Sequence, residues 1–175
     1  MFYTSPLGST LDGVDRGEDV VITSVASDDV DETFPSRHGV HAMARNHYQG
    51  KRITITHQPS GIAYVLNLRA YDSGIAFCFE LNHRGAKELT GETSSFVLPR
   101  GTHVWSQRGT NVYENIYSGA DLGAIPPDSA MGPPVVSRLP EGAGYVAITQ
   151  SAPERGFPNP FLVKSKEGHR FQVAY

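Results

Sequence analysis

The sequence lacks several features that would place it directly in a large class of proteins. It has a single cysteine, Cys78, which excludes an intramolecular disulfide and a zinc site built on several thiolates. It also lacks an apolar run long enough to cross a bilayer and a basic cluster interleaved with aromatic residues. We therefore expect neither a membrane nor a nucleic-acid partner. Because Cys78 lies between Phe77 and Phe79, we predict a buried, unreactive thiol.

Common catalytic motifs are missing as well. The chain has no Gly-x-Ser-x-Gly, no Walker-type loop and no Gly-x-Gly-x-x-Gly fingerprint. His38, His41 and His47 are close in sequence, but their spacing fits no compact zinc motif, so we interpret them as part of a solvated polar loop. The first six residues lack a charged segment followed by an apolar one, so no signal peptide is visible and the compartment stays open.

Length and composition favour one globular domain. The chain has 175 residues, of which 39% are hydrophobic, and its formal net charge is −3. A chain of this size supports one well-packed core, and we predict a single domain over residues 1–175. Its 18 glycines and 12 prolines are spread along the sequence, which is typical of short strands separated by turns.

The clearest structural signal is a β-hairpin. Apolar residues alternate with polar ones over residues 62–71 and again over residues 75–81, and Asp72-Ser73-Gly74 between them is typical of a turn. We predict that the hairpin lies in the core and that five of its side chains are buried: Tyr64, Leu66, Leu68, Phe77 and Phe79. On this basis Phe77→Ala should cost about 3–5 kcal/mol.

The rest of the chain also favours strands. We predict them at residues 20–25, 51–57, 95–98, 102–106, 112–117, 135–139, 145–149, 161–163 and 170–174, and irregular loops at residues 28–46 and 118–134. No segment shows the i, i+3, i+4 apolar pattern of a substantial helix. The fold class is therefore all-β, an antiparallel β-sandwich with few or no helices.

Two residues are candidates for a binding role. Glu114 precedes a long Gly/Pro-rich stretch, and a carboxylate at a strand end suits a hard cation or sugar hydroxyls, although a solvated strand glutamate is the alternative. Trp105 is the only tryptophan. It is either a core or interface aromatic or a platform on which a sugar stacks.

Several short tracts, in this order and spacing, resemble the N-terminal domain of glycoside hydrolase family 97, the α-glucosidases and α-galactosidases. The tracts are Ser5-Pro6-Leu7-Gly8, Asp31-Glu32-Thr33-Phe34, Arg45-Asn46-His47-Tyr48, residues 68–77, Glu92-Thr93-Ser94-Ser95-Phe96, Tyr113-Glu114-Asn115-Ile116-Tyr117 and residues 145–149. The chain departs from the family at Gln150-Ser151, where a Glu-Ala pair is usual, and at Cys78, where an arginine is usual.

The resemblance implies a fold and a role. The family's N-terminal domain is a galactose-mutarotase-like super-sandwich that packs on a (β/α)₈ catalytic barrel and contributes a glutamate beside a calcium ion. By similarity Glu114 corresponds to that glutamate, so it is expected to contact metal and substrate, with Trp105 as a further substrate-binding candidate. Calcium is expected only together with the barrel, and family members are often exported or periplasmic.

The same resemblance leaves the catalytic barrel outside this chain. Glycoside hydrolysis needs two carboxyl groups at a defined separation, so the isolated chain is expected to be inactive. Two alternatives remain open from the sequence: a stand-alone carbohydrate-binding module, and a structural module that forms a homodimer through an exposed docking face.

Overall fold

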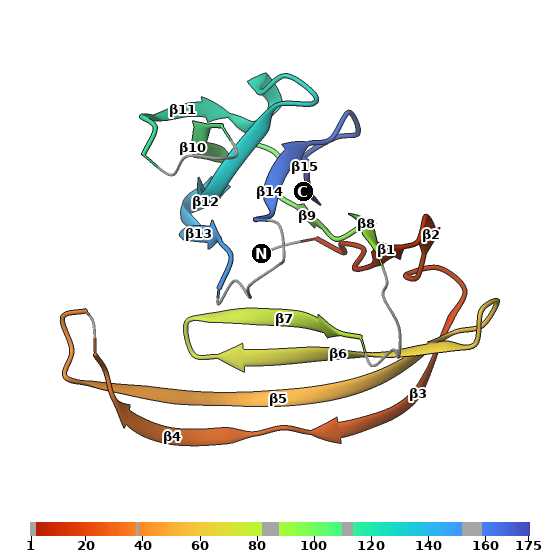
Figure 1. Cartoon of the computed structure of the whole chain (residues 1–175). Helices are drawn as coiled ribbons and strands as arrows, with labels where there is room; N and C mark the ends of the chain where they lie inside the picture. The colour runs from red at the N-terminus through yellow and green to blue at the C-terminus, as the bar shows by residue number, and fades with distance from the viewer. Residues whose placement is uncertain (1–2, 38, 82–87, 110–113, 152–158) are drawn as a thin grey trace. The chain divides into compact units, whose positions relative to one another are not determined.

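A computed structural model describes the chain except for residues 1–2, 38, 82–87, 110–113 and 152–158. In this described part the chain forms fifteen strands and two short 3₁₀ helices (Figure 1). They divide into two compact units, Glu18–Lys87 on the one hand and Met1–Gly17 with Glu88–Tyr175 on the other, and each is considered by itself. The single domain over residues 1–175 stays a prediction.

The unit Glu18–Lys87 is one antiparallel sheet with the strand order β3-β5-β6-β7, to which β4 adds by pairing with β5. Its strands are β3 (Val20–Ser27), β4 (Val30–Pro35), β5 (Met43–His57), β6 (Ile62–Tyr71) and β7 (Gly74–Glu80). The first half of β5 pairs with β4 and the second half with β3, so these two strands follow one another along the same edge of β5 (Figure 1).

The predicted hairpin is confirmed. β6 and β7 pair antiparallel from Tyr71↔Gly74 to Val65↔Glu80, and Asp72 and Ser73 make the turn. Tyr64 and Leu66 are buried as predicted.

The burial of the other three hairpin residues, Leu68, Phe77 and Phe79, was predicted too strongly, because each is only partly buried. Phe77 and Phe79 lie on β7, the outermost strand of its sheet, so each has a neighbouring strand on one side only, and Leu68 on β6 pairs with Phe77.

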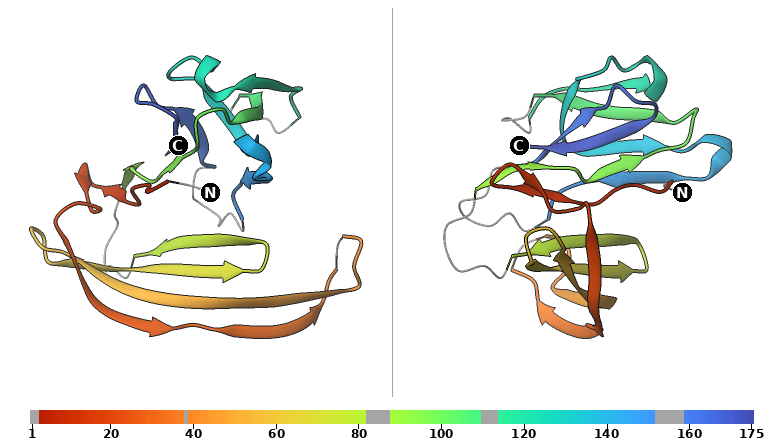
Figure 2. Two further views of the ribbon diagram at one scale, coloured as in Figure 1. Left: turned by 180° about the vertical axis from the view of Figure 1, so that it is seen from behind. Right: turned by 90° about the vertical axis from the view of Figure 1, so that its right-hand side faces the viewer.

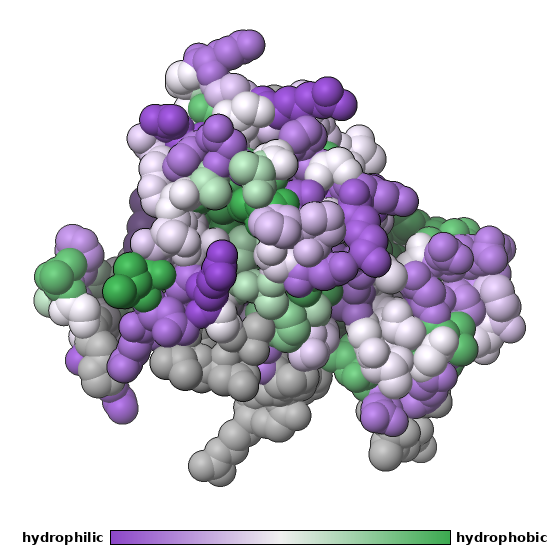
Figure 3. All heavy atoms as spheres, turned by 90° about the horizontal axis from the view of Figure 1, so that it is seen from above, coloured by the Kyte–Doolittle hydropathy of each residue, from purple (hydrophilic) through white to green (hydrophobic). Residues whose placement is uncertain are grey.

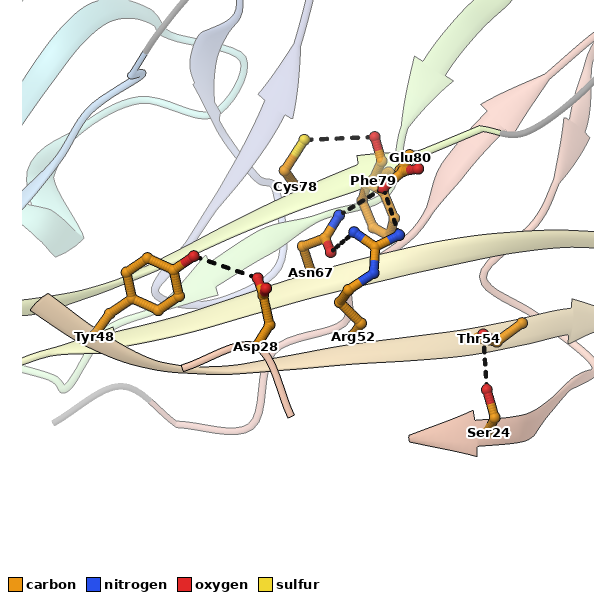
Figure 4. Close-up of polar contacts among 9 residues, drawn as sticks. All are labelled: Ser24, Asp28, Tyr48, Arg52, Thr54, Asn67, Cys78, Phe79 and Glu80. Atoms are coloured by element: carbon orange, nitrogen blue, oxygen red, sulfur yellow. Dashed lines mark hydrogen bonds and ion pairs between the residues drawn. The ribbon is translucent and has the colours of Figure 1, made fainter. Parts of the chain in front are cut away.

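Strand alternation also corrects the prediction for Cys78, which is exposed. The register Arg52↔Asn67↔Cys78 puts the thiol on the polar face of the sheet, while Phe77 and Phe79 point to the opposite face. Figure 4 shows Cys78 beside this polar row. Two flanking phenylalanines therefore indicate the opposite of burial for a residue within a strand.

The other unit contains two sheets. A small one has the order β2-β1-β8, and a larger one has the order β11-β10-β12-β14-β15-β9, with β13 also paired to β12. Figure 2 shows the strands of this unit from two further directions. The strands are β1 (Ser9–Leu11), β2 (Val14–Asp15), β8 (Leu89–Glu92), β9 (Ser95–Val97), β10 (His103–Arg108), β11 (Tyr117–Asp121), β12 (Ala130–Arg138), β13 (Tyr145–Ile148), β14 (Phe161–Lys164) and β15 (Arg170–Ala174). The 3₁₀ helices are η1 (Leu122–Ala124) and η2 (Pro140–Gly142).

One face of the larger sheet carries a hydrophobic core, whose buried members are Leu98, Val104, Leu122, Met131, Val135, Leu139, Ile148, Leu162 and Phe171. Phe171 and Val135 are fully buried. Burial of a large apolar side chain contributes about 1.5–3 kcal/mol relative to exposure, so this cluster is the main source of stability for the unit.

The two predicted loops are largely wrong. Residues 28–46 contain β4 and the start of β5, which are held by cross-strand side-chain pairs. Arg45 donates from Nε and Nη2 to the carboxylate of Asp31 at 2.8 and 2.7 Å, and Asn46 donates to Glu32 at 2.8 Å. Both faces of β4 and of the start of β5 are largely solvated. A strand with two solvated faces needs no alternation of apolar and polar residues, so a polar sequence is compatible with it.

Residues 118–134 contain most of β11, the helix η1 and the start of β12. Of the strand predicted at 112–117, residues 112 and 113 lie outside the described part, Glu114 to Ile116 are not in a strand, and β11 begins only at Tyr117.

The packing makes a prediction about stability. Phe171→Ala should lower the free energy of unfolding by about 3–5 kcal/mol, because the ring is completely buried and its removal leaves a cavity. Phe77→Ala is the matched control, and its partly exposed ring should cost less than about 3 kcal/mol. Urea titration followed by far-ultraviolet circular dichroism measures both values, and equal losses would contradict the core placed around Phe171.

Candidate functional site

Glu114 lies in the connection between β10 and β11 and is exposed. The residue after it is anchored to β10, because the backbone N–H of Asn115 donates to Oε1 of Gln107 at 3.1 Å and its side-chain amide donates to the carbonyl of Arg108 at 2.6 Å. Gln107 is fully buried. The backbone next to Glu114 is thus fixed to the sheet.

Apolar residues lie directly beyond this glutamate. Ile116 is 91% exposed, and Tyr117 is 39% exposed although its hydroxyl donates to the carbonyl of Pro134 at 3.0 Å. An exposed carboxylate and an almost fully exposed isoleucine therefore lie two residues apart, just before the outermost strand of the larger sheet.

The described residues do not complete a metal site around Glu114. Among them, no three histidine, cysteine, aspartate or glutamate side chains are grouped so that they could hold a metal ion. His38 lies outside the described part, and His41 and His47 are both exposed. Any cation held by Glu114 would need most of its ligands from other parts of the protein.

Trp105 is on β10 and belongs to a cluster of rings. Its ring centroid lies 4.6 Å from that of His103, in an edge-on arrangement. The centroid of Tyr145 lies 6.3 Å from that of Trp105, and the planes of these two rings differ by only 30°. Trp105 is partly buried and Tyr145 is 70% exposed. Of the roles considered for Trp105, a position in the core is not found, because the side chains of the core lie on the opposite face. An interface aromatic and a sugar platform both stay open.

Glycine on the neighbouring strand makes room for these rings. Gly119 pairs with Trp105, and a Cβ atom added there would lie 2.7 Å from Nε2 of His103 and 3.0 Å from Nε1 of Trp105. Only a residue without a side chain lets both rings keep their present positions. Polar groups surround the rings: Nδ1 of His103 is 2.8 Å from Oδ1 of Asp121, and the guanidinium carbon of Arg138 is 5.9 Å from the centroid of Trp105.

Trp105 lies on β10, whereas Glu114 lies in the connection from β10 to β11. Trp105 pairs with Gly119, whereas Glu114 lies beyond the last β10–β11 pair, Gln107↔Tyr117. The sequence predicted both residues as substrate-binding candidates, and this stays a prediction. Tyr145, His103, Asp121 and Arg138 were not predicted, because no local pattern relates strands so far apart in sequence.

On the polar face of the unit Glu18–Lys87, charged side chains are paired with neighbouring groups of the same face. Nη2 of Arg52 lies 3.0 Å from Glu80, and the same guanidinium donates to Asn67 at 3.0 Å (Figure 4). Tyr48 donates its hydroxyl to Asp28 at 3.3 Å and packs under the guanidinium of Arg69. Burial raises the pKa of Tyr48 above its ordinary value. We interpret this network as structural, since its groups are paired with one another.

One hollow, of about 570 Å³, is lined by Tyr3, Leu98, Arg100, Leu139, Glu141 and His169, among others, and neither Glu114 nor Trp105 lines it. On the face of the molecule shown in Figure 3, apolar residues lie in separated groups among hydrophilic ones. Among the described residues, no helix is long and apolar enough to span a membrane.

Solved structures share this fold. The chain is similar to a β-arabinopyranosidase, with a TM-score of 0.88 and 18% identity over 99% of this chain and 30% of that one. It is also similar to a glycoside hydrolase family 97 enzyme from Pseudoalteromonas sp. strain K8, solved in complex with panose, with a TM-score of 0.83 and 21% identity over 98% of this chain and 26% of that one. The strands and these similarities define an antiparallel β-sandwich, as predicted.

Residues 1–175 match the family model described as glycosyl-hydrolase 97 N-terminal, and the chain belongs to that family. A curated relative is a retaining α-galactosidase from Bacteroides thetaiotaomicron, 26% identical over 179 residues that cover 95% of this chain and 26% of the relative. The chain thus spans about a quarter of the length of this relative.

The packing around Gly119 is testable through the only tryptophan of the chain. Gly119→Ala should shift the emission maximum of Trp105, because the new methyl group forces the indole or the imidazole to move. The stability loss should be about 1 kcal/mol or less, since both rings lie at the surface of the sheet. Gly91→Ala is the control, as its added Cβ meets only Thr10 at ordinary contact distance. Identical spectra for the two variants and the parent chain would refute the arrangement.

Proposed function

We propose that this chain is the non-catalytic N-terminal β-sandwich of an α-glycoside hydrolase, which packs on a (β/α)₈ barrel and contributes Glu114 to a calcium and sugar site. The observation that carries the proposal is that the chain matches the family's N-terminal domain over residues 1–175 while covering only 26% of the α-galactosidase relative. The pair of carboxyl groups that glycoside hydrolysis requires would lie in the remaining part.

Glu114 suits a role at the boundary with another domain. Its backbone is held through Asn115, its side chain is exposed, and Ile116, two residues further on, is 91% exposed. An apolar side chain beside a carboxylate is what a surface presents when another part of the protein covers it and brings further ligands. The apolar neighbour would stabilise the contact, and the carboxylate would reach the cation.

Coordination number supports a shared site. Calcium takes six to eight oxygen ligands, and one glutamate supplies one or two of them. Because the described residues hold no other group of metal ligands, the remaining oxygens would come from the barrel, from water and from the sugar. A homodimer through an exposed docking face is the alternative use of the same surface.

The first prediction concerns calcium. Calorimetric titration of the isolated chain should detect no tight calcium site, because Glu114 alone is a weak ligand. In a protein that also contains the barrel, Glu114→Gln should weaken calcium binding by at least 10-fold and leave the thermal midpoint of the calcium-free protein unchanged. Glu141→Gln, at another exposed glutamate, serves as the matched control. A submicromolar site in the isolated chain, or equal affinities for both variants, would overturn the role of Glu114.

The second prediction concerns turnover. The isolated chain should not release nitrophenol from aryl α-glucosides or α-galactosides, since the catalytic carboxyl pair is proposed to lie outside it. The control is a protein extended through the barrel, which should turn over at least one of them. Hydrolysis by the isolated chain that a single carboxylate substitution abolishes would show that the active site is local.

A further inference from the structure

We propose that Trp105 and Tyr145 form an open carbohydrate-binding platform on the outer face of the larger sheet. The platform would bind neutral oligosaccharides without calcium. This goes beyond the proposed function, because it involves neither Glu114 nor a metal ion.

The strand register assembles the platform from four strands. One row across the sheet is Asp121, His103, Arg138 and Tyr145, and the next row is Gly119, Trp105, Val136 and Ala147. The row between them is Ala120, Val104, Ser137 and Val146, of which Val104 belongs to the buried core and Val146 packs against it. The other two rows therefore lie on the face of the sheet that is turned away from the core.

The composition of this outer face is unusual. An antiparallel sheet with one solvated face normally alternates apolar residues towards the core with polar residues towards solvent. Here the second row holds Trp105, Val136 and Ala147 at outward positions, and Tyr145 in the first row is 70% exposed. These apolar side chains do not pack into the core of the unit, which lies on the opposite face. Their position indicates that they contact a ligand or another surface.

The shape of the face suits a sugar ring. The planes of Trp105 and Tyr145 differ by only 30°, and their centroids are 6.3 Å apart, so the two rings lie in a roughly common orientation. Trp105 is flanked in its row by Gly119 and Val136, and Ala147 follows Val136, so the row holds small or branched side chains rather than long ones. A pyranose has a weakly polar face of C–H groups that packs against aromatic rings in the same way as other apolar groups.

Polar groups stand where the hydroxyl groups of a stacked sugar would lie. His103 and Asp121 are joined at 2.8 Å, which fixes an imidazole and a carboxylate at one side of the indole. The guanidinium carbon of Arg138 lies 5.9 Å from the indole centroid, near the outer limit of a cation–π contact. Arg138 would therefore lose only a weak contact with the indole if it donated to a sugar hydroxyl instead. Apolar surface with a few fixed donors and acceptors is typical of small-molecule sites.

The same polar groups disfavour other occupants. A protein surface would bury Arg138 and Asp121, both exposed, and would need to pair each charge to avoid a desolvation cost. A nucleic acid would need a basic surface, whereas the chain has a net charge of −3. A neutral sugar needs neither, because its hydroxyl groups both donate and accept hydrogen bonds.

The test uses the fluorescence of Trp105, the only tryptophan in the chain. Maltotriose and raffinose would be titrated separately into the isolated chain, with and without EGTA. A saturable change in emission at millimolar sugar, unaffected by EGTA, is expected for at least one of them. No saturable change with either sugar would overturn the proposal, and dependence on calcium would assign the response to a metal site instead.

Variants separate stacking from a general effect on the fold. Tyr145→Ala should weaken binding at least 10-fold without changing the thermal midpoint, because its ring is largely exposed. Tyr3→Ala is the matched control, since Tyr3 is 60% exposed in the same unit, lines the separate hollow and makes its pairing through the backbone. Equal affinities for the two variants would overturn the platform. Failure here would leave the calcium role of Glu114 untouched.

Discussion

In an antiparallel sheet each side chain points to the face opposite that of its neighbours in the strand, so one register fixes the whole surface. This constraint places Val104 in the core and Trp105 on the outside. It aligns Trp105 with Gly119 on one side and Val136 on the other, although these residues are distant in sequence. The platform and the core therefore depend on the same pairing of β10, β11 and β12.

Sequence patterns predict strands well where one face is apolar and the other polar. The hairpin of β6 and β7 follows from its alternation and turn residues, and Arg170–Ala174 is predicted with its observed limits. Patterns fail where both faces are solvated, as in β4, whose stability rests on pairs such as Asp31–Arg45. They fail also for Cys78, because aromatic neighbours in a strand point away from it.

The two candidate sites differ in how much of each could be predicted from the sequence. Glu114 became a candidate through its position before a Gly/Pro-rich stretch and through its resemblance to a family motif, but local pattern placed it in a strand and not between two strands. Trp105 attracts attention as a unique residue, but its partner Tyr145 is recognisable only once β12 has aligned β10 with β13. Sites assembled across strands require the register, which short segments of sequence do not contain.

The long strand β5 has a consequence for self-association. β3 and β4 together line one side of it. The outer edges of β3 and β4 carry backbone N–H and C=O groups with which a further strand could pair. β4 carries Asp31 and Glu32 and ends at Pro35. Charged side chains on an edge strand disfavour pairing with a second copy of that edge, and proline offers no N–H to it. β4 is thereby protected against the ribbon-like stacking that leads to aggregation.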